Sequence, residues 1–228
     1  MKIFADFEYC HDSEKPSKRS YVDLIQLGFV ICDDNYNILN QIGVDVRPAH
    51  LPLTDYIENL TGLTTEVLKK AKPLNKVLKD IEDYILQADI IYVFGNYDEV
   101  ALNRNKNYVS SNNKHLINVM TSKMCEISVR GSNSSLSLEE CCEVAGIKSN
   151  NKHSALCDAY NLYQVYKYLS SVEELPPEVA CFLVYKSSFK TLNGLCKLVS
   201  KEKLLKLVDT LYNDKGRLGY KDFINLTG

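Results

Sequence analysis

Two acidic residues, Asp6 and Glu8, stand two positions apart in an otherwise apolar segment near the start of the chain. Alternate residues of a β-strand point to the same face of a sheet, so a strand over 2–8 would place both carboxylates on one face. Two carboxylates in a poorly solvated site cannot both ionise without a counter-charge, and hard divalent cations take oxygen ligands. The pair is therefore a candidate metal site, although taken alone it is more often the polar face of an edge strand.

Three further residues could join such a site. Asp98 follows the apolar run 89–94 across a turn at Gly95, and ligands bind at the carboxyl ends of strands in α/β sheets. Taken alone, Asp98 is also an ordinary acid at a helix N-terminus, where it favours the helix dipole. His153 lies at the expected start of a helix and Asp158 about one turn inside it, so both can reach one point. A histidine at a helix start is, by itself, more often a surface residue.

The elements that must position these residues form a mixed α/β sheet. Segments 2–8, 22–32 and 38–47 are expected as strands with short connections, which favours an antiparallel meander. The pattern then turns helical from 54 to 87, with a short helix that ends near Gly62. A longer helix follows, with apolar residues at three- and four-residue steps: Leu74, Val77, Leu78, Ile81 and Ile85.

The second half of the sheet is expected to be parallel. The run 89–94 predicts a central strand that feeds a helix, and a further strand is expected near Leu116–Val119. Ser137 and Glu140 form a capping box that opens a helix ending at Gly146, and a last helix is expected over 154–169. This order predicts a mixed sheet that helices cover, with right-handed crossovers.

Residues 1–171 and 172–228 are expected to be two parts of the chain, because Pro176 and Pro177 mark a joint. Beyond the joint the patterns are short and helical, including Leu195–Leu198 and Lys203–Leu211, so residues 172–228 are expected to form a helical accessory extension. Its lysines could guide an incoming strand, or its apolar residues could cover a patch on the first part.

Composition limits the class of protein. With 228 residues, 45% of them hydrophobic and 25% charged, the chain can bury a core, and its formal charge of −2 gives no broad positive field. A nucleic-acid substrate would therefore be held by local contacts and bound metal. The eight cysteines form no CxxC pair and are expected as reduced thiols rather than zinc ligands. No apolar segment is long enough to span a membrane, so we expect no membrane contact and a cytoplasmic location.

In chain order, Asp6, Glu8, Asp98, His153 and Asp158 resemble the site residues of the DEDDh (DnaQ-like) 3′→5′ exonuclease superfamily. Further segments over residues 1 to about 170 carry the resemblance: Asp6-Phe7-Glu8, Leu60-Thr61-Gly62-Leu63-Thr64, Phe94-Gly95-Asn96-Tyr97-Asp98 with Leu102, and His153 to Ala159. Ser154 stands where the tyrosine subclass has its tyrosine, which indicates the histidine subclass. The sequence is most similar to the small RNA-trimming members with a D-F-E first motif.

The resemblance implies a ribonuclease H-like fold and hydrolysis of phosphodiester bonds from the 3′ end of single-stranded nucleic acid, RNA favoured, with release of nucleoside 5′-monophosphates. It implies two divalent cations, Mg²⁺ or Mn²⁺, held by the carboxylates of Asp6, Glu8, Asp98 and Asp158. His153 would then be the base that takes a proton from the attacking water.

Phe7, Tyr9 and Leu63 are expected to bind the terminal nucleotide, with the segment Leu60–Thr64 as part of the wall. Tyr9 and Leu63 could equally be core residues. Two other functions remain open: a DNA-directed, proofreading-like exonuclease, and an inactive module on the same scaffold that binds nucleic acid or a protein.

Overall fold

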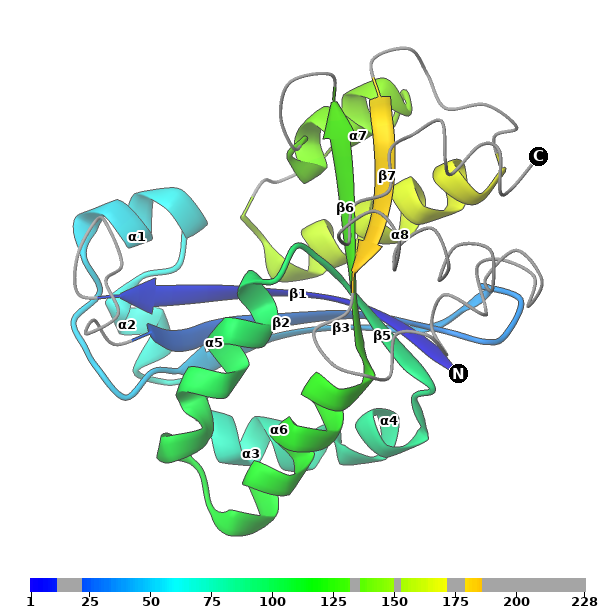
Figure 1. Ribbon diagram of the computed structural model, residues 1–228. Coiled ribbons are helices and arrows are strands. Elements are labelled where there is room, and N and C mark those ends of the chain that lie inside the picture. Colours follow the sequence, from blue (N-terminus) through cyan, green and yellow to red (C-terminus); the bar gives the residue numbers. More distant parts are fainter. Residues whose placement is uncertain (12–21, 132–135, 150–152, 172–178, 186–228) are drawn as a thin grey trace, which may run out of the picture.

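The computed structural model describes residues 1–11, 22–131, 136–149, 153–171 and 179–185 (Figure 1). Within them the chain forms a seven-stranded mixed sheet in the order β4-β3-β2-β1-β5-β6-β7. The strands are β1 (Lys2–His11), β2 (Val22–Cys32), β3 (Ile38–Arg47), β4 (Lys72–Pro73), β5 (Ile90–Phe94), β6 (Met124–Gly131) and β7 (Val179–Tyr185).

The strand pairing confirms the predicted mixed sheet. β1, β2 and β3 form the antiparallel meander, and β5 pairs parallel with both β1 and β6. β7 returns antiparallel to β6, and the two-residue β4 pairs with the end of β3. Because β1 is the fourth of the seven strands in this order, its side chains lie near the middle of the sheet.

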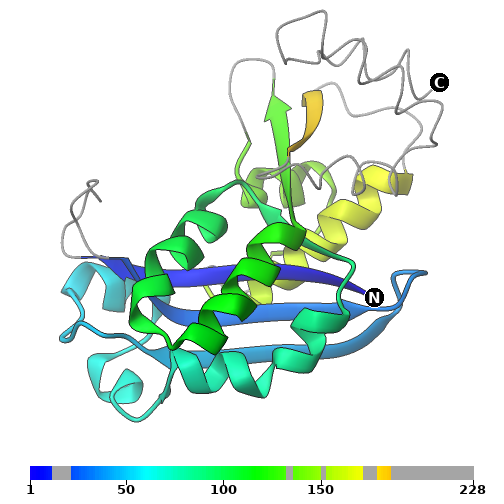
Figure 2. The ribbon, with the colours of Figure 1, turned by 60° about the horizontal axis from the view of Figure 1, so that its bottom comes forward.

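Helices cover both faces of this sheet, as Figures 1 and 2 show. The helices are α1 (Asp55–Thr61), α2 (Thr65–Leu68), α3 (Leu74–Asp80), α4 (Glu82–Gln87), α5 (Tyr97–Asn105), α6 (Ser111–Lys123), α7 (Leu138–Val144) and α8 (Ala155–Ser171), with a 3-10 turn at Lys106–Tyr108. α3 to α6 cover one face, whereas α7 and α8 lie on the other (Figures 1 and 2).

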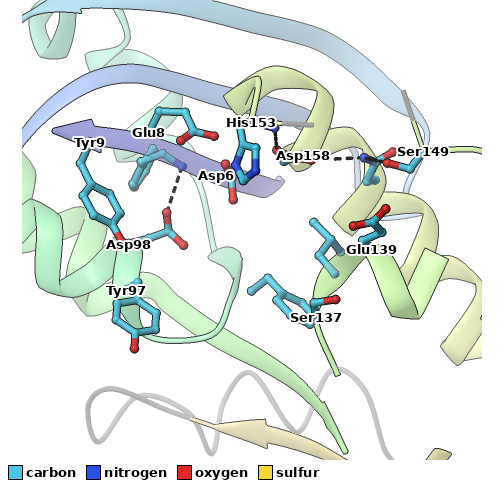
Figure 3. Close-up of a pocket in the computed structure, with 14 residues that line it drawn as sticks. Asp6, Glu8, Tyr9, Tyr97, Asp98, Ser137, Glu139, Ser149, His153 and Asp158 are labelled. Atoms are coloured by element: carbon cyan, nitrogen blue, oxygen red, sulfur yellow. Dashed lines mark hydrogen bonds between the residues drawn. The ribbon is translucent and has the colours of Figure 1, made fainter. Parts of the chain in front are cut away.

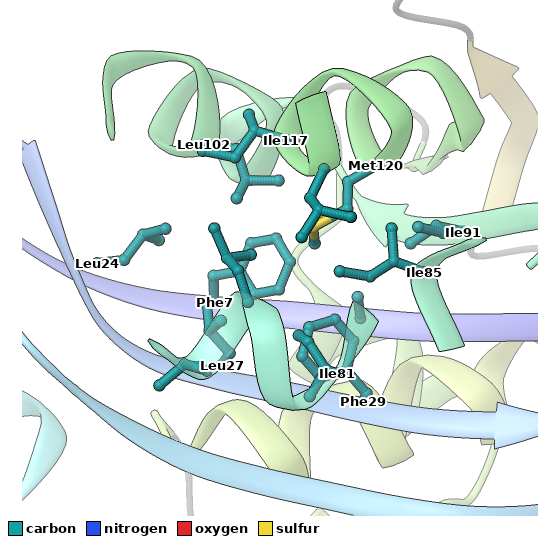
Figure 4. Packing of buried hydrophobic residues seen from close by; sticks show 14 of the residues in the cluster. Phe7, Leu24, Leu27, Phe29, Ile81, Ile85, Ile91, Leu102, Ile117 and Met120 are labelled. Carbon is teal, nitrogen blue, oxygen red and sulfur yellow. The ribbon is translucent and has the colours of Figure 1, made fainter. Parts of the chain in front are cut away.

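The alternation of β1 decides which residues face which layer. Ile3, Ala5 and Phe7 point into the core under α3 to α6, which Figure 4 shows around Phe7. Phe4 points the other way and packs against the tyrosines of β5 and α8. Asp6 and Glu8 continue the register of Phe4, so both carboxylates face α8, as the strand pattern predicts.

Two predictions about the middle of the chain are wrong. Leu116–Val119 is not a strand but part of α6, where Leu116, Ile117 and Met120 are buried at helical spacing, and the strand follows as β6. A four-residue apolar run does not distinguish a strand from a buried helical turn. The expected helix over Leu74–Ile85 is two helices, because the backbone at Ile81 leaves helical geometry (φ −109°, ψ 7°) between α3 and α4.

The expectation that residues 172–228 contain only helical patterns is also wrong, because Val179–Tyr185 forms β7 against β6. This run is rich in β-branched and aromatic residues, which fit a strand. The expected segments Leu195–Leu198 and Lys203–Leu211 lie outside the described residues, so the helical extension and the division at residue 171 stay predictions.

Several cysteines fill space inside the fold, as predicted. Within the described ranges Cys10, Cys32, Cys125, Cys141 and Cys142 are buried free thiols, and Cys157 is partly buried. In the same ranges, no helix has both the length and the apolar character needed to cross a membrane.

Candidate active site

β1 carries the first two carboxylates, Asp6 and Glu8, on the face of the sheet that points toward α8. Asp6 and Glu8 are partly buried, and oxygen atoms of these residues and of Asp158 all lie within 4.8 Å of one another. Asp158 comes from α8, more than 140 residues along the chain. The fold therefore brings together three carboxylates that a divalent cation could bind at once.

Asp98 adds a fourth carboxylate from the first turn of α5. Its side chain is only 4% exposed, and its Oδ1 accepts a hydrogen bond of 2.9 Å from the backbone N–H of Phe7. Burial raises the pKa of Asp98 to about 8, and the hydrogen bond from Phe7 opposes that rise. This contact ties the start of α5 to β1 between the two acids of that strand (Figure 3).

The turn before α8 carries the histidine. His153 has a positive φ of 61°, a conformation that non-glycine residues adopt rarely. Its backbone N–H donates to Asp158 Oδ2 at 3.0 Å, and the Asn161 side chain donates to Asp158 Oδ1 at 3.3 Å. The turn thus holds Asp158 and places the exposed His153 at the same pocket (Figure 3).

The electrostatics of the site favour a bound cation. Burial, followed by the charges of Asp98, Glu8 and Asp158, raises the pKa of Asp6 well above its ordinary value. Burial and the charge of Asp158 raise the pKa of Glu8 to about 7, and burial raises that of Asp158. Four crowded carboxylates disfavour their own ionised forms, and a divalent cation removes that penalty. The donor set, all oxygen, fits Mg²⁺ or Mn²⁺.

All five predicted residues line one pocket of about 310 Å³. Its remaining lining residues are Phe7, Tyr9, Phe94, Tyr97, Ser137, Leu138, Glu139, Ser149 and Asn161 (Figure 3). The wall from the start of α7 and the exposed ring of Tyr97 were not expected from the sequence. For Tyr97 the sequence held one local signal, namely that this residue directly precedes Asp98. For α7 it held none, because the position of that helix depends on how it packs against the rest of the fold.

The three residues expected to bind substrate differ in their positions. Tyr9 is partly buried and lines the pocket. Phe7 contributes to the lining, but its side chain is 3% exposed and packs against Phe29 in the core. Leu63 packs against the cluster that contains Ile57 and Leu68 and is not among the lining residues. Contacts of all three with a substrate stay predictions.

Comparison with known protein families covers most of the chain. The model of the RNase_T exonuclease family matches residues 3–166. A PolC-type DNA polymerase III from Streptococcus sanguinis (strain SK36) is 31% identical over 85 residues, which are 37% of this chain and 6% of that much longer protein.

Solved structures that share the fold include the two that follow. The nuclease domain of 3′hExo, a DEDDh family member bound to rAMP, has a TM-score of 0.57 and 17% identity, over 80% of this chain and 96% of that one. E. coli exonuclease I in complex with a dT13 oligonucleotide has a TM-score of 0.55 and 16% identity, over 75% of this chain and 41% of that one. With the family match over most of the chain and the five residues around one pocket, the chain belongs to the RNase_T exonuclease family, within the DEDDh superfamily.

Proposed function

We propose that this chain hydrolyses phosphodiester bonds one after another from the 3′ end of single-stranded nucleic acid, RNA favoured, and releases nucleoside 5′-monophosphates. The observation that carries the proposal is the convergence of four carboxylates and one histidine, from β1, α5 and the start of α8, on one pocket. Clustered carboxylates are costly to bury unless they bind cations. In a nuclease, such cations would activate the water and stabilise the charge on the phosphate.

Two divalent cations, Mg²⁺ or Mn²⁺, are the proposed cofactors. Asp6, Glu8 and Asp158 are the proposed ligands of the first, and Asp98 with Asp6 would hold the second. Bound cations of this kind lower the pKa of a water nucleophile and offset the charge that builds on the phosphate. The chain then needs few cationic side chains at the site, in keeping with its formal charge of −2.

His153 is the proposed general base. It is exposed at the pocket, and its backbone is held by the hydrogen bond to Asp158. An imidazole in its neutral form can accept the proton of the attacking water at a ring nitrogen. The turn thus places His153 at the same pocket as the four carboxylates, where the proposed base would meet the water.

Aromatic and apolar side chains on the rim are proposed to hold the terminal bases. Tyr9, Tyr97 and Leu138 line the pocket, and Tyr97 is 69% exposed. Stacking on such side chains accepts any base, which suits an enzyme that removes successive nucleotides. The complex of 3′hExo with rAMP favours RNA as the proposed substrate, and the complex of exonuclease I with dT13 keeps DNA as the alternative.

The test is degradation of matched RNA and DNA 12-mers that carry a 5′ label. With Mn²⁺ we expect the RNA to shorten in single-nucleotide steps, faster than the DNA, and chelation to stop the reaction. A 3′-phosphate should slow the reaction, and a circular strand should survive, because the pocket must admit a free 3′ end.

Rapid cutting of the circle would refute the 3′-end requirement. Faster loss of the DNA would select the DNA-directed alternative. If neither strand shortens with Mn²⁺ although the chain binds them, the chain is an inactive binding module.

A further inference from the structure

The first turn of α8 is anchored by a side chain from the sheet. The N–H groups at the start of a helix lack partners within the helix. Here the Ala155 N–H donates to the Oε1 atom of Gln26, on β2, at 2.8 Å. This contact joins residues 129 positions apart in the chain, and it lies three residues before Asp158.

A second hydrogen bond fixes the orientation of the Gln26 amide. Its Nε2 donates to Asp45 Oδ1 at 2.8 Å, and Gln26 and Asp45 are opposite each other in the pairing of β2 with β3. An ionised carboxylate only accepts hydrogen bonds, so Asp45 holds the nitrogen of the amide and leaves the oxygen for Ala155. The pair therefore forms a relay from β3 through β2 to the start of α8.

Close contact between α8 and β2 completes this anchor. A Cβ atom at Gly28 would lie 2.1 Å from the backbone C and O atoms of Ala155, so only glycine lets α8 lie this close to the sheet. In the β1–β2 pairing, Gly28 lies opposite Asp6 and Gln26 lies opposite Glu8. The two residues that receive the start of α8 are thus the cross-strand neighbours of the two carboxylates of β1.

From this arrangement we propose that Gln26, held by Asp45, is a positioning residue that sets the place of Asp158 relative to Asp6 and Glu8. The inference rests on the proposed function, because it gives the relay a role in binding the cations. A helix moves as a rigid unit, so a change at Ala155 displaces Asp158 in the same turn. Outer contacts that orient metal ligands typically change metal affinity or activity by about 10–100-fold when removed.

The experiment measures Mn²⁺ affinity by titration calorimetry and, separately, turnover on a 5′-labelled oligonucleotide. Gln26→Ala should weaken Mn²⁺ binding by about tenfold or more while the chain remains folded, because Asp158 loses its fixed position. Gln26→Glu should also weaken binding, since the new carboxylate accepts from Ala155 but repels Asp45.

The double variant Gln26→Glu with Asp45→Asn supplies the sharper test. The amide introduced at position 45 can donate to the carboxylate at position 26, which restores the relay with reversed polarity. We expect Mn²⁺ affinity within a few-fold of the wild type. The single and the double variant carry the same carboxylate at position 26, beside Glu8. The difference between their Mn²⁺ affinities therefore reports the contact with position 45.

Two results would overturn the proposal: unchanged Mn²⁺ affinity in Gln26→Ala, or no recovery in the double variant relative to Gln26→Glu. A loss of stability alone, with Mn²⁺ affinity retained, would mean that the relay only supports folding. If the wild type binds Mn²⁺ but cleaves nothing, the proposed function fails, and the affinities still decide the role of Gln26.

Discussion

Glu8→Gln should stabilise the protein in the absence of divalent cations, although it removes a proposed ligand. The folded chain raises the pKa of the Glu8 carboxyl from 4.5 to about 7, through burial and the charge of Asp158. An acid with a raised pKa destabilises the folded state when it is ionised, so this penalty is absent below about pH 4.5 and complete above about pH 7. Glutamine keeps the shape of the side chain and never carries the charge.

The size of the effect follows from the same pKa. Each tenfold change in proton affinity is worth about 1.4 kcal/mol, so the rise to about 7 corresponds to a penalty of about 3 kcal/mol at alkaline pH. Glu8 is partly exposed and water screens its charge, so we expect Glu8→Gln to gain about 1–3 kcal/mol near pH 8. Near pH 5 the gain should be below about 1 kcal/mol, because the carboxyl of the wild type is then mostly protonated in the folded chain.

Urea unfolding in the presence of a chelator, near pH 5 and near pH 8, measures this difference directly. Glu143→Gln, at an exposed residue of α7, is the matched control and should change stability little at either pH. Added Mn²⁺ should reverse the order, because the wild type gains more binding free energy than the variant. A variant that is less stable than the wild type near pH 8 without metal would refute the reasoning.

Three further predictions concern other residues, and two of them include a comparison variant. His153→Ala should lower turnover by about 100-fold or more and leave Mn²⁺ binding unchanged, so loss of the metal in calorimetry would make His153 a ligand instead. Gly28→Ala should cost about 3 kcal/mol or more in urea unfolding, because the added Cβ meets the Ala155 backbone at 2.1 Å. Gly43→Ala should cost less, since its Cβ meets the Leu156 side chain at 3.1 Å, and equal costs would contradict the close contact of α8. Tyr97→Ala should raise KM for an oligonucleotide by about 5–100-fold through lost stacking, whereas Tyr56→Ala, on α1, should not, and an equal rise in both would argue against a stacking role.

The sequence predicted the parts of the fold that local patterns determine. The alternation of β1 placed Asp6 and Glu8 on one face, and the capping box at Ser137 marked the start of α7, where the structure has both of its hydrogen bonds. The structure also brings Asp98, His153 and Asp158 to the same pocket. Only the combination of these residues with Asp6 and Glu8 predicted a shared pocket, because each residue taken alone has a common structural explanation.

What the sequence could not predict depends on packing between distant segments. The wall formed by Leu138 and Glu139 lies near Asp158 because of how α7 packs against α8, and nothing at these positions indicates it locally. The contact of Gln26 with Ala155 joins residues 129 positions apart. The sequence around Gln26 carries no motif that would predict this contact. The strand β7 was missed because a run of apolar residues after a proline pair fits either a strand or a buried helix.

The most direct test of the central claim is metal-dependent shortening of a 5′-labelled single-stranded RNA by the wild type and by Asp6→Asn. Asp6 is the residue whose pKa the other three carboxylates all raise, so it lies at the centre of the proposed cation site. We predict a 3′→5′ ladder with Mn²⁺ for the wild type and for the control Asp55→Asn, on α1, and almost no cleavage by Asp6→Asn, which should stay folded. Full activity of Asp6→Asn, or cleavage by the wild type that survives chelation of all divalent cations, would contradict the account.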